Sequence, residues 1–462
     1  MAGTRRFRNR GILLFLLSFF LLIAFSGCAT PPRVETLPTP DASPAVIAPR
    51  GALPPQKQAE VLRKLDEETE SSLLSRHIAL VESVGGSPLI TGNRVKLLVD
   101  APAAYEAMFQ AMREARDHIN IEVYLFADDE IGTRFADLLL EKRASGVQVN
   151  VLYDSVGCRD VPDEFFQRLR DGGVKALEFN PTDPSKTRRK WLLTERDHRK
   201  ILIVDGKVAF MGGINIAKVY SEGSGKLFGG NTNLPWRDTH VRIEGPAVAE
   251  IQKLFLEAWA EQHGPKLESG QLFPRLDGKG DDLVQVVGNR PGEDTPKIYF
   301  MYFANIAWAE RTVYLTNPYF VPDDRILDAL KGAARRGVDV RILLPGSSDI
   351  GVIFYAGRSF YTELLKAGVR LYERKGVLLH AKTAVIDGVW STVGSTNLEM
   401  WSFTRNFEAN TIILNPGFAF EMEQLFFYDL ADSKEVRLEE WERRPARERV
   451  KEWFIRRFRH WL

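Results

Sequence analysis

The pattern of hydrophobic and polar positions occurs twice along this chain of 462 residues. Each time, a short apolar run is followed by apolar residues at helical spacing, then a glycine, then a second apolar run. The three segments cover 119–124, 135–140 and 147–152 in the first half, and 312–315, 326–334 and 338–343 in the second. Short runs rich in Val and Ile predict buried strands, and helical spacing between them predicts a helix.

This repeated strand, helix, strand unit predicts an α/β fold in which helices cover the faces of a sheet. Because the unit is duplicated, we expect two similar βαβ-rich domains that face each other across a pseudo-two-fold axis. The polar, glycine-rich stretch at 264–282 predicts the boundary, which places the first domain at 61–270 and the second at 271–440. The chain exceeds the length of one ordinary domain, which agrees with this division.

Residues 1–28 have the pattern of a targeting segment. Residues 1–10 carry four arginines and no acid, residues 11–25 are mostly apolar, and Cys28 follows two small residues. This order is typical of a secretory signal. Its end resembles the lipobox of bacterial lipoproteins, which implies lipid attachment at Cys28, although Phe25 stands where leucine is usual. A slightly short transmembrane anchor is the alternative, and both interpretations hold the chain at a membrane.

Two further segments flank the predicted domains. Residues 29–60 contain eight prolines and few large apolar residues, which predicts an extended linker without secondary structure. Residues 441–462 are basic, and their aromatic residues recur at helical spacing. Two interpretations of this basic amphipathic tail remain open. It either lies on an anionic membrane surface or packs on the second domain with its arginines in solvent.

Charge and cysteine content exclude several classes of protein. Lys and Arg total 62 and Asp and Glu total 61, so the formal net charge is +1. No overall field attracts a polyanion, and nucleic acid is therefore not an expected partner. The two cysteines exclude a disulfide framework, and no zinc-ligand spacing of Cys and His occurs. We expect neither a structural metal nor a cofactor.

A set of polar residues recurs in both halves at one spacing. Each set has a histidine, a lysine at offset 2, an aspartate at offset 7, a glycine at offset 14 and an asparagine at offset 17. The two sets are His198, Lys200, Asp205, Gly212, Gly213 and Asn215, and His380, Lys382, Asp387, Gly394, Ser395 and Asn397. A single copy would indicate no more than a surface strand and a turn, whereas two matched copies in a repeat indicate shared chemistry.

Elementary geometry brings the members of each set together. Alternate residues of a strand project from one face, so each histidine lies beside its lysine. The Asp-Gly pairs at 205–206 and 387–388 predict hairpin turns that return the small residues and the asparagine toward the histidine. The small residues would let a phosphate approach the backbone, and the asparagine amides would donate to it. We expect Asp205 and Asp387 to lie away from the phosphate and to stabilise the fold.

These residue types suit exchange at a phosphodiester. One neutral histidine can attack phosphorus, and a second can protonate the leaving alkoxide. Lys200 and Lys382 supply the positive charge that the transition state needs, without a metal ion. The sequence therefore predicts a phosphoryl-transfer site built from both halves.

The two sets resemble the HxKxxxxD motif of the phospholipase D superfamily. The resemblance implies that fold, with one active site between the domains and a covalent phosphohistidine intermediate. It also implies an orienting carboxylate after each motif, for which Asp238 and Glu408 are the candidates. Which histidine each acid serves remains open. By analogy with the family, His198 is the nucleophile and His380 the general acid and then the base, and the reverse order remains open.

Wider segments resemble bacterial cardiolipin synthases. They lie at 196–200, 236–238, 242–246, 317–322 and 358–361, within a likeness that covers most of 75–460. The resemblance implies transfer of a phosphatidyl group to His198 and then to the hydroxyl of phosphatidylglycerol, which yields cardiolipin; phosphatidylethanolamine is an alternative lipid substrate. In one respect the chain departs from those synthases. They commonly have membrane-spanning segments, and this chain has a lipoprotein-like start.

Two other functions remain open on this sequence. A phospholipase D-type hydrolase of lipid or nucleic acid would use the same residues with water as the acceptor. A non-catalytic lipid-binding lipoprotein is the third, against which the intact motifs argue. In each case we expect a bacterial cell-envelope protein, anchored through its N-terminus, with its body on the periplasmic or extracytoplasmic side.

Overall fold

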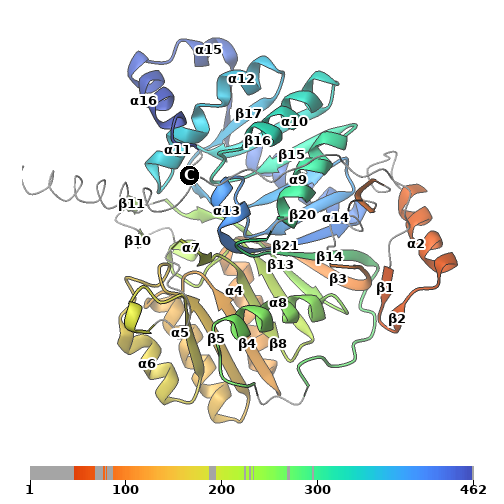
Figure 1. Ribbon diagram of the computed structural model, residues 1–462, viewed down its shortest axis with the longest axis vertical. Coiled ribbons are helices and arrows are strands. Elements are labelled where there is room, and N and C mark those ends of the chain that lie inside the picture. Colours follow the sequence, from red (N-terminus) through yellow and green to blue (C-terminus); the bar gives the residue numbers. More distant parts are fainter. Residues whose placement is uncertain are drawn as a thin grey trace, which may run out of the picture.

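The computed structural model describes residues 46–67, 76–78, 80, 87–186, 194–222, 225–227, 230–232, 234–267, 271–293, 296–459 and 462. Within these residues the chain forms two halves with the same order of strands and helices, one above the other in Figure 1. This arrangement confirms the predicted α/β fold with two similar domains. The expected lipid-attachment residue, Cys28, and the signal segment lie outside the described residues.

The first half begins with a long strand and continues through alternating helices and strands. Its main elements are β3 (Leu89–Val99), α4 (Asp100–Glu114), β4 (His118–Val123), α5 (Glu130–Ala144), β5 (Gln148–Asp154), α6 (Asp163–Asp171), β6 (Lys175–Phe179), β8 (Lys200–Val204), β9 (Val208–Gly212), α7 (Val219–Glu222), β13 (Thr239–Glu244) and α8 (Val248–Glu261). A short hairpin of β10 (Gly225–Leu227) and β11 (Gly230–Thr232) follows α7.

The second half repeats this order. Its main elements are β14 (Asp282–Asn289), α9 (Lys297–Trp308), β15 (Thr312–Thr316), α10 (Asp324–Arg335), β16 (Asp339–Pro345), α11 (Gly351–Arg358), α12 (Tyr361–Lys366), β17 (Arg370–Arg374), β19 (Thr383–Ile386), β20 (Trp390–Gly394), α13 (Met400–Thr404), β21 (Asn406–Leu414), α14 (Pro416–Ala431) and β22 (Ser433–Val436).

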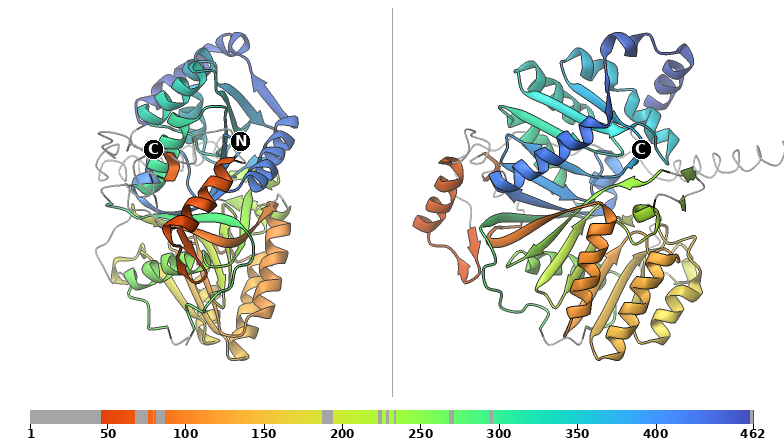
Figure 2. Two further views of the ribbon diagram at one scale, coloured as in Figure 1. Left: turned by 90° about the vertical axis from the view of Figure 1, so that its right-hand side faces the viewer. Right: turned by 180° about the vertical axis from the view of Figure 1, so that it is seen from behind.

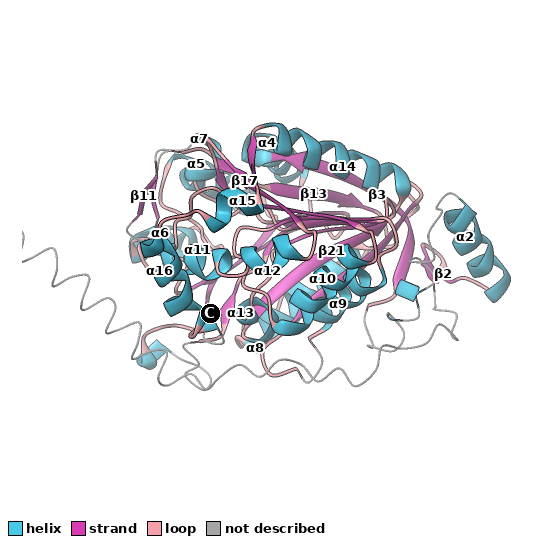
Figure 3. Cartoon of the chain, turned by 90° about the horizontal axis from the view of Figure 1, so that it is seen from above, coloured by secondary structure: helices cyan, strands magenta, loops and turns pink. Residues whose placement is uncertain are grey.

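The strands of both halves join in one continuous sheet. Across the first half the order is β6, β5, β4, β8, β9, β13 and β3. Across the second it is β17, β16, β15, β19, β20, β21 and β14. The halves meet where β3 pairs antiparallel with β14, the orange and green strands at the waist in Figure 2. Figure 3 shows the equivalent helices α4 and α9 on opposite sides of the strands.

The predicted helices begin and end where their capping residues require. The side chain of Asp129 accepts a hydrogen bond from Gly132 N at the start of α5, and Asp323 accepts from Ile326 N at the start of α10. Shortly after these helices the chain turns at Gly146 and Gly337, both with φ of +95°. Only glycine adopts this conformation without strain, so it ends both helices and starts the next strand.

Both Asp-Gly pairs form the predicted hairpin turns. β8 pairs antiparallel with β9, and β19 with β20. The φ angles of Asp205 and Gly206 are +53° and +61°, and those of Asp387 and Gly388 are +52° and +67°. Two consecutive positive φ angles match the right-handed twist of a two-residue hairpin, which explains why Asp-Gly occurs in both halves.

The expectation that residues 29–60 carry no secondary structure is wrong for their described part. β1 (Val46–Ala48) pairs in parallel with β3, β2 (Gly51–Ala52) pairs with β1, and α2 (Pro55–Glu67) follows. Val46 is fully buried in the core of the second half. The proline signal failed here because a single buried side chain and an edge strand are enough to include this segment in the sheet, and because proline suits the first turn of a helix.

The C-terminal segment forms α15 (Leu438–Glu442) and α16 (Ala446–Arg456). Trp441 and Leu462 are buried in the core of the second half, so the tail packs on this domain. Among the described helices, none has both the length and the apolar composition needed to cross a bilayer.

Candidate active site

The strand before His198 pairs with the other half of the molecule. β7 (Arg196–Asp197) pairs in parallel with the first two residues of β21, and His198 N donates to the carbonyl of Phe407. The next residue of β21 is Glu408, which therefore lies beside the histidine. Nδ1 of His198 is 3.0 Å from Oε1 and 3.2 Å from Oε2 of Glu408.

The strand before His380 likewise pairs with the other half of the molecule, here the first half. β18 (Leu378–Leu379) pairs in parallel with β12 (Trp236–Arg237) of the first half, and His380 N donates to the Arg237 carbonyl. The same register places Asp238 beside His380. Their Nδ1 and Oδ2 atoms are 2.7 Å apart.

The two acids are therefore exchanged between the halves, which answers the question that the sequence left open. Each histidine takes its carboxylate from the other domain, so neither half holds a complete set. The positive charge of Lys382 also acts on His198, and that of Lys200 on His380. All four basic residues thus belong to one site between the halves.

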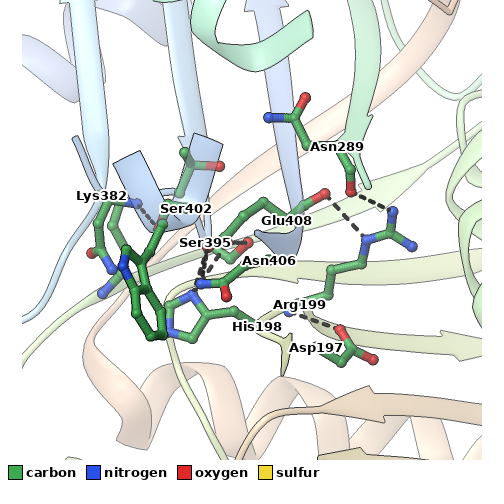
Figure 4. Close-up of polar contacts among 12 residues, drawn as sticks. Asp197, His198, Arg199, Asn289, Lys382, Ser395, Ser402, Asn406 and Glu408 are labelled. Atoms are coloured by element: carbon green, nitrogen blue, oxygen red, sulfur yellow. Dashed lines mark hydrogen bonds and ion pairs between the residues drawn. The ribbon is translucent and has the colours of Figure 1, made fainter. Parts of the chain in front are cut away.

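Glu408 is fully buried and holds several polar partners. The hydroxyl of Ser395 donates to Oε2, at 2.5 Å, and Nδ2 of Asn406 lies 3.4 Å from Oε1. Figure 4 shows Glu408 between these side chains and His198. Ser395 was expected only as a small residue near phosphate, whereas its hydroxyl fixes the carboxylate that orients the histidine.

Asp238 is held by the chain itself. Its Oδ1 accepts from Thr239 N at 2.7 Å, and Gly213 lies against it. A Cβ atom at Gly213 would stand 2.2 Å from Oδ1 of Asp238. The expectation that this glycine makes room for a phosphate is therefore corrected, because the orienting carboxylate occupies that space.

The other two glycines of the motifs make room for neighbouring strands. A Cβ at Gly212 would lie 2.5 Å from the carbonyl oxygen of Thr239 on β13. At Gly394 it would lie 2.2 Å from Oδ1 of Asn410 on β21. These glycines let β13, which directly follows Asp238, and β21, which carries Glu408, pack closely, so they act on the site through the sheet.

The lysines lie beside their histidines as the strand geometry predicted. Nζ of Lys200 donates to the His198 carbonyl, and Nζ of Lys382 to the His380 carbonyl. Burial lowers the pKa of Lys200 to about 7 and that of Lys382 to about 8, although the carboxylates of Glu408 and Asp238 act in the opposite direction. A phosphate between them would favour the charged forms.

The histidines are neutral and the acids ionised near neutral pH. Burial, together with the charge of Lys382, lowers the pKa of His380 to about 3, and burial also lowers the pKa of His198. Burial opposes ionisation of Asp238 and Glu408, but the histidines and lysines outweigh it and keep both pKa values below the ordinary ones. A neutral ring whose Nδ1 donates to a carboxylate has Nε2 as its basic atom.

The two asparagines of the motifs occupy different settings. Nδ2 of Asn215 donates to the hydroxyl of Tyr220 at 2.6 Å, and its Oδ1 accepts from Leu125 N. Asn397 is buried, and its Oδ1 has no hydrogen-bond partner among the described residues. Donation to a phosphate by either amide stays a prediction, and Asn215 would first have to release Tyr220.

Asp205 and Asp387 hold the fold, as expected. Asp205 accepts from the backbone N–H groups of 116–118, which lead into β4. Asp387 accepts from those of 310–312, which lead into β15. Each carboxylate therefore ties the hairpin turn of a motif to the first strand of the βαβ unit.

Comparisons with known proteins identify the family of this chain. The family model described as "Cardiolipin synthase, PLD-like domain" matches residues 108–224 and 302–430. A cardiolipin synthase of Geobacillus sp. (strain WCH70) is 37% identical over 382 residues, which span 81% of this chain and 74% of that protein. Cardiolipin synthase A of Pseudomonas putida is 36% identical over 363 residues, 77% of this chain and 72% of that protein. The chain belongs to the cardiolipin synthase family of phospholipase D-like enzymes.

The fold of this family member also matches a solved structure. The crystal structure of phosphatidylserine synthase from Haemophilus influenzae Rd KW20 has a TM-score of 0.62, with 12% identity, and covers 83% of this chain and 97% of that one. At this identity the likeness concerns the fold alone. In the described part of the chain, no cluster of three or more His, Cys, Asp or Glu could hold a metal ion.

Sequence reasoning missed Arg199, which lies between the two motif residues of the first half. Its side chain is fully buried, and Nε donates to the Glu408 carbonyl at 3.1 Å. Its other nitrogens lie 3.2 Å from the Asn289 carbonyl and 3.4 Å from Glu122. The strand alternation that pairs His198 with Lys200 directs Arg199 to the opposite face, and this signal could have identified it.

Aromatic side chains around the histidines were also missed. Tyr124 lies 5.2 Å from His198 between ring centroids, and Trp236, Tyr220 and Tyr319 lie 4.9, 5.6 and 6.3 Å from His380. They come from both halves and give the site apolar walls that hold the imidazole rings. Nothing in their spacing along the sequence separates them from ordinary core aromatics.

Proposed function

We propose that this enzyme transfers a phosphatidyl group between phospholipids to make cardiolipin, through a covalent phosphohistidine and without a metal ion. It is a phospholipase D-family phosphatidyltransferase by membership, and the proposal adds the intermediate and the substrates. The observation that carries it is the pair of crossed contacts between histidine Nδ1 and carboxylate, at 3.0 and 2.7 Å. These contacts leave Nε2 of each histidine available for chemistry, in a site that also holds two lysines.

In the first step, Nε2 of His198 attacks phosphorus and the bond to the head-group oxygen breaks. A proton from His380 neutralises the departing alkoxide. The bound phosphodiester supplies the negative charge that raises the low pKa of His380 in the empty site. His198 is assigned as nucleophile by family analogy, and its side chain is more exposed, 12% against 5% for His380.

In the second step, His380 removes a proton from the hydroxyl of phosphatidylglycerol. The resulting alkoxide attacks phosphorus, the P–N bond to His198 breaks, and cardiolipin leaves. Lys200 and Lys382 hold the phosphate oxygens throughout. We further propose phosphatidylglycerol as substrate, with phosphatidylethanolamine as an alternative, at the bacterial envelope. The boundaries at 61–270 and 271–440 and the anchor at 1–28 are part of this proposal.

A lipid assay tests the reaction. Full-length protein would be incubated with bilayers of phosphatidylglycerol, with and without phosphatidylethanolamine, in the presence of a metal chelator. Mass spectrometry would identify the products. We expect cardiolipin from the wild type and none from His198→Ala or His380→Ala. Phosphatidic acid alone would instead identify a hydrolase, and lack of any lipid product would direct attention to other diesters, including nucleic acid.

The intermediate can be trapped separately. A His380→Asn variant keeps the proposed nucleophile but lacks the base of the second step. We expect it to accumulate phosphatidyl-His198 after mixing with a lipid that carries a good leaving group, as found by peptide mass spectrometry. If a His198→Asn variant instead accumulates the phosphatidyl adduct on His380, the roles of the two histidines are reversed.

A further inference from the structure

The C-terminal helix α16 turns several acidic and basic side chains toward the body of the protein. Glu452 is 2% exposed, accepts two hydrogen bonds from Arg444 at 2.7 and 3.0 Å, and lies 3.7 Å from Arg358. Arg456 pairs with Glu363, and Lys451 donates to the hydroxyl of Tyr355 on α11. The inward side of this helix is therefore held by ion pairs and hydrogen bonds, together with Ile455, which packs on the core of the second half.

Its opposite side is apolar and exposed. Val450, Trp453 and Phe454 are 62%, 58% and 52% exposed, among the largest values for apolar residues in the described chain. With Arg457 they occupy positions i, i+3, i+4 and i+7, which form one stripe along a helix. An ordinary surface helix buries such a stripe, so this reversed orientation indicates a partner outside the protein. We call Val450, Trp453 and Phe454 the docking face.

Unpaired positive charge borders the docking face. Arg449 and Arg457 are exposed, and no carboxylate pairs with either within the part of the chain that the structure describes. The guanidinium of Arg457 lies 4.2 Å from the ring centroid of Trp453, so charge and aromatic surface are presented together. An exposed apolar stripe between arginines suits the boundary of acyl chains and anionic head groups.

The helix lies on the same side of the molecule as elements whose residues line the active site. α16 packs on α11, and Figures 1 and 3 place both on the same side as α7. Tyr220 of α7 lies beside His380. Asp349, two residues before α11, accepts a hydrogen bond at 2.8 Å from Tyr319, whose ring also faces His380. The elements that carry the docking face are thus continuous with the walls of the site.

We propose that the docking face inserts into the surface of an anionic phospholipid bilayer and turns the entrance of the active site toward its lipid substrates. This inference rests on the proposed function for the identity of the substrate. A second copy of the chain fits the face less well. Three apolar side chains on one helix are far short of the roughly 800 Å² per partner that a stable dimer buries, and the two arginines would repel their counterparts.

A kinetic experiment separates docking from chemistry. The full chain and a Trp453→Ser/Phe454→Ser variant would be assayed on phosphatidylglycerol vesicles and on the same lipid dispersed in detergent micelles. Because the docking face is needed only at a bilayer, we expect a loss of about tenfold or more on vesicles and less than twofold in micelles. The matched control is Phe420→Ser/Tyr428→Ser, which removes two aromatic residues exposed 61% and 69% on α14.

The outcomes distinguish this inference from the proposed function. If wild type makes cardiolipin in both formats and the variant matches it on vesicles, the docking inference is wrong and the proposed function stands. If wild type makes no cardiolipin in micelles or vesicles, the proposed function fails, and docking is judged by binding alone. If the variant has a lower oligomeric state than the wild type in detergent, the face is a protein interface and the inference is overturned.

Binding of the docking face to a bilayer can be measured without any reaction. An environment-sensitive fluorophore would be attached to a Val450→Cys variant of the full chain, with the parent chain, which keeps Cys28 and Cys158, as the blank. We expect a blue shift on vesicles that contain phosphatidylglycerol and little on phosphatidylcholine alone. A fluorophore on Tyr428→Cys of α14 should not shift. Equal spectra for position 450 in both lipids would contradict an anionic docking face.

Discussion

At the scale of single residues, the site depends on which nitrogen of each histidine meets a carboxylate. Both histidines present Nδ1 to a buried acid, so both keep Nε2 for chemistry. Glu408 is in turn held by Ser395, and Asp238 by Thr239 and the space that Gly213 leaves. Ser395 and Gly213, which were expected from the sequence only as small motif residues, therefore act by holding the two acids in place.

Removal of either acid's charge should slow transfer without unfolding the protein. We expect Glu408→Gln and Asp238→Asn to lower the turnover rate by about 10²–10⁴-fold, because the amide no longer holds the correct tautomer or stabilises a charged ring. Initial rates of cardiolipin formation provide the measurement, and circular dichroism checks the fold. Glu244→Gln, a half-buried acid on β13, is the control. Rates within threefold of wild type would remove both acids from the mechanism.

We expect the lysines to set an alkaline limit on activity. Lys200 has a pKa lowered to about 7 and Lys382 to about 8, so both are charged below these values and lose their protons as pH rises through them. Because the charged forms hold the phosphate, we expect kcat/KM to fall above pH about 7–8. Lys200→Arg should move this fall upward, since guanidinium stays charged. A kcat/KM that still rises at pH 9 would contradict this role.

At the scale of elements, the hairpin turns connect chemistry to architecture. Each Asp-Gly turn reverses the chain between two strands, and its carboxylate also accepts backbone hydrogen bonds at the entry to the first βαβ strand. The motif aspartates thereby fix where β8 and β19 lie relative to the first strand of each βαβ unit. This also fixes the position of the histidine that precedes each strand.

Loss of a turn carboxylate should lower stability more than activity. Asp205→Ala leaves three backbone donors of 116–118 without their acceptor, and we expect the free energy of unfolding to fall by about 2–3 kcal/mol. Urea denaturation measures this, and Asp277→Ala, at an exposed position, should change it by less than about 0.5 kcal/mol. The rate per folded molecule should stay within a few-fold. A stable but inactive Asp205→Ala protein would place this aspartate in the chemistry.

At the scale of the whole molecule, one sheet passes through both halves and the active site lies where they meet. Because the acids are exchanged, neither domain holds both members of a histidine–carboxylate pair, and Arg199 joins the domains through carbonyls of β14 and β21. The C-terminal helix is a separate addition on the second half. It is held by a buried acid and exposes its apolar stripe.

Glu452 should decide whether α16 stays attached. Glu452→Ala leaves Arg444 and Arg358 without their buried partner, so we expect local opening of α16 to become easier by about 2 kcal/mol, or roughly 30-fold in exchange protection. Hydrogen–deuterium exchange of 446–456 measures this, with Glu448→Ala on the same helix as the control. Unchanged protection in Glu452→Ala would show that packing of Trp441 and Leu462 alone holds the tail.

The sequence by itself determined what depends on local order. The duplicated βαβ pattern and the Asp-Gly turns depend on a few neighbouring residues, so periodicity and turn chemistry predicted them correctly. The same holds for the histidine and lysine of each motif, because alternation along a strand leaves no choice of face.

Only the tertiary structure decided which segments meet. His198 and Glu408 are 210 residues apart, and their contact depends on the register between β7 and β21, which no local pattern encodes. The inclusion of Val46 in the sheet and the orientation of α16 have the same cause. The sequence pattern of an apolar stripe is the same whether the stripe faces the protein or the solvent. In α16, the ion pairs of Glu452 with its neighbours determine that the stripe faces outward.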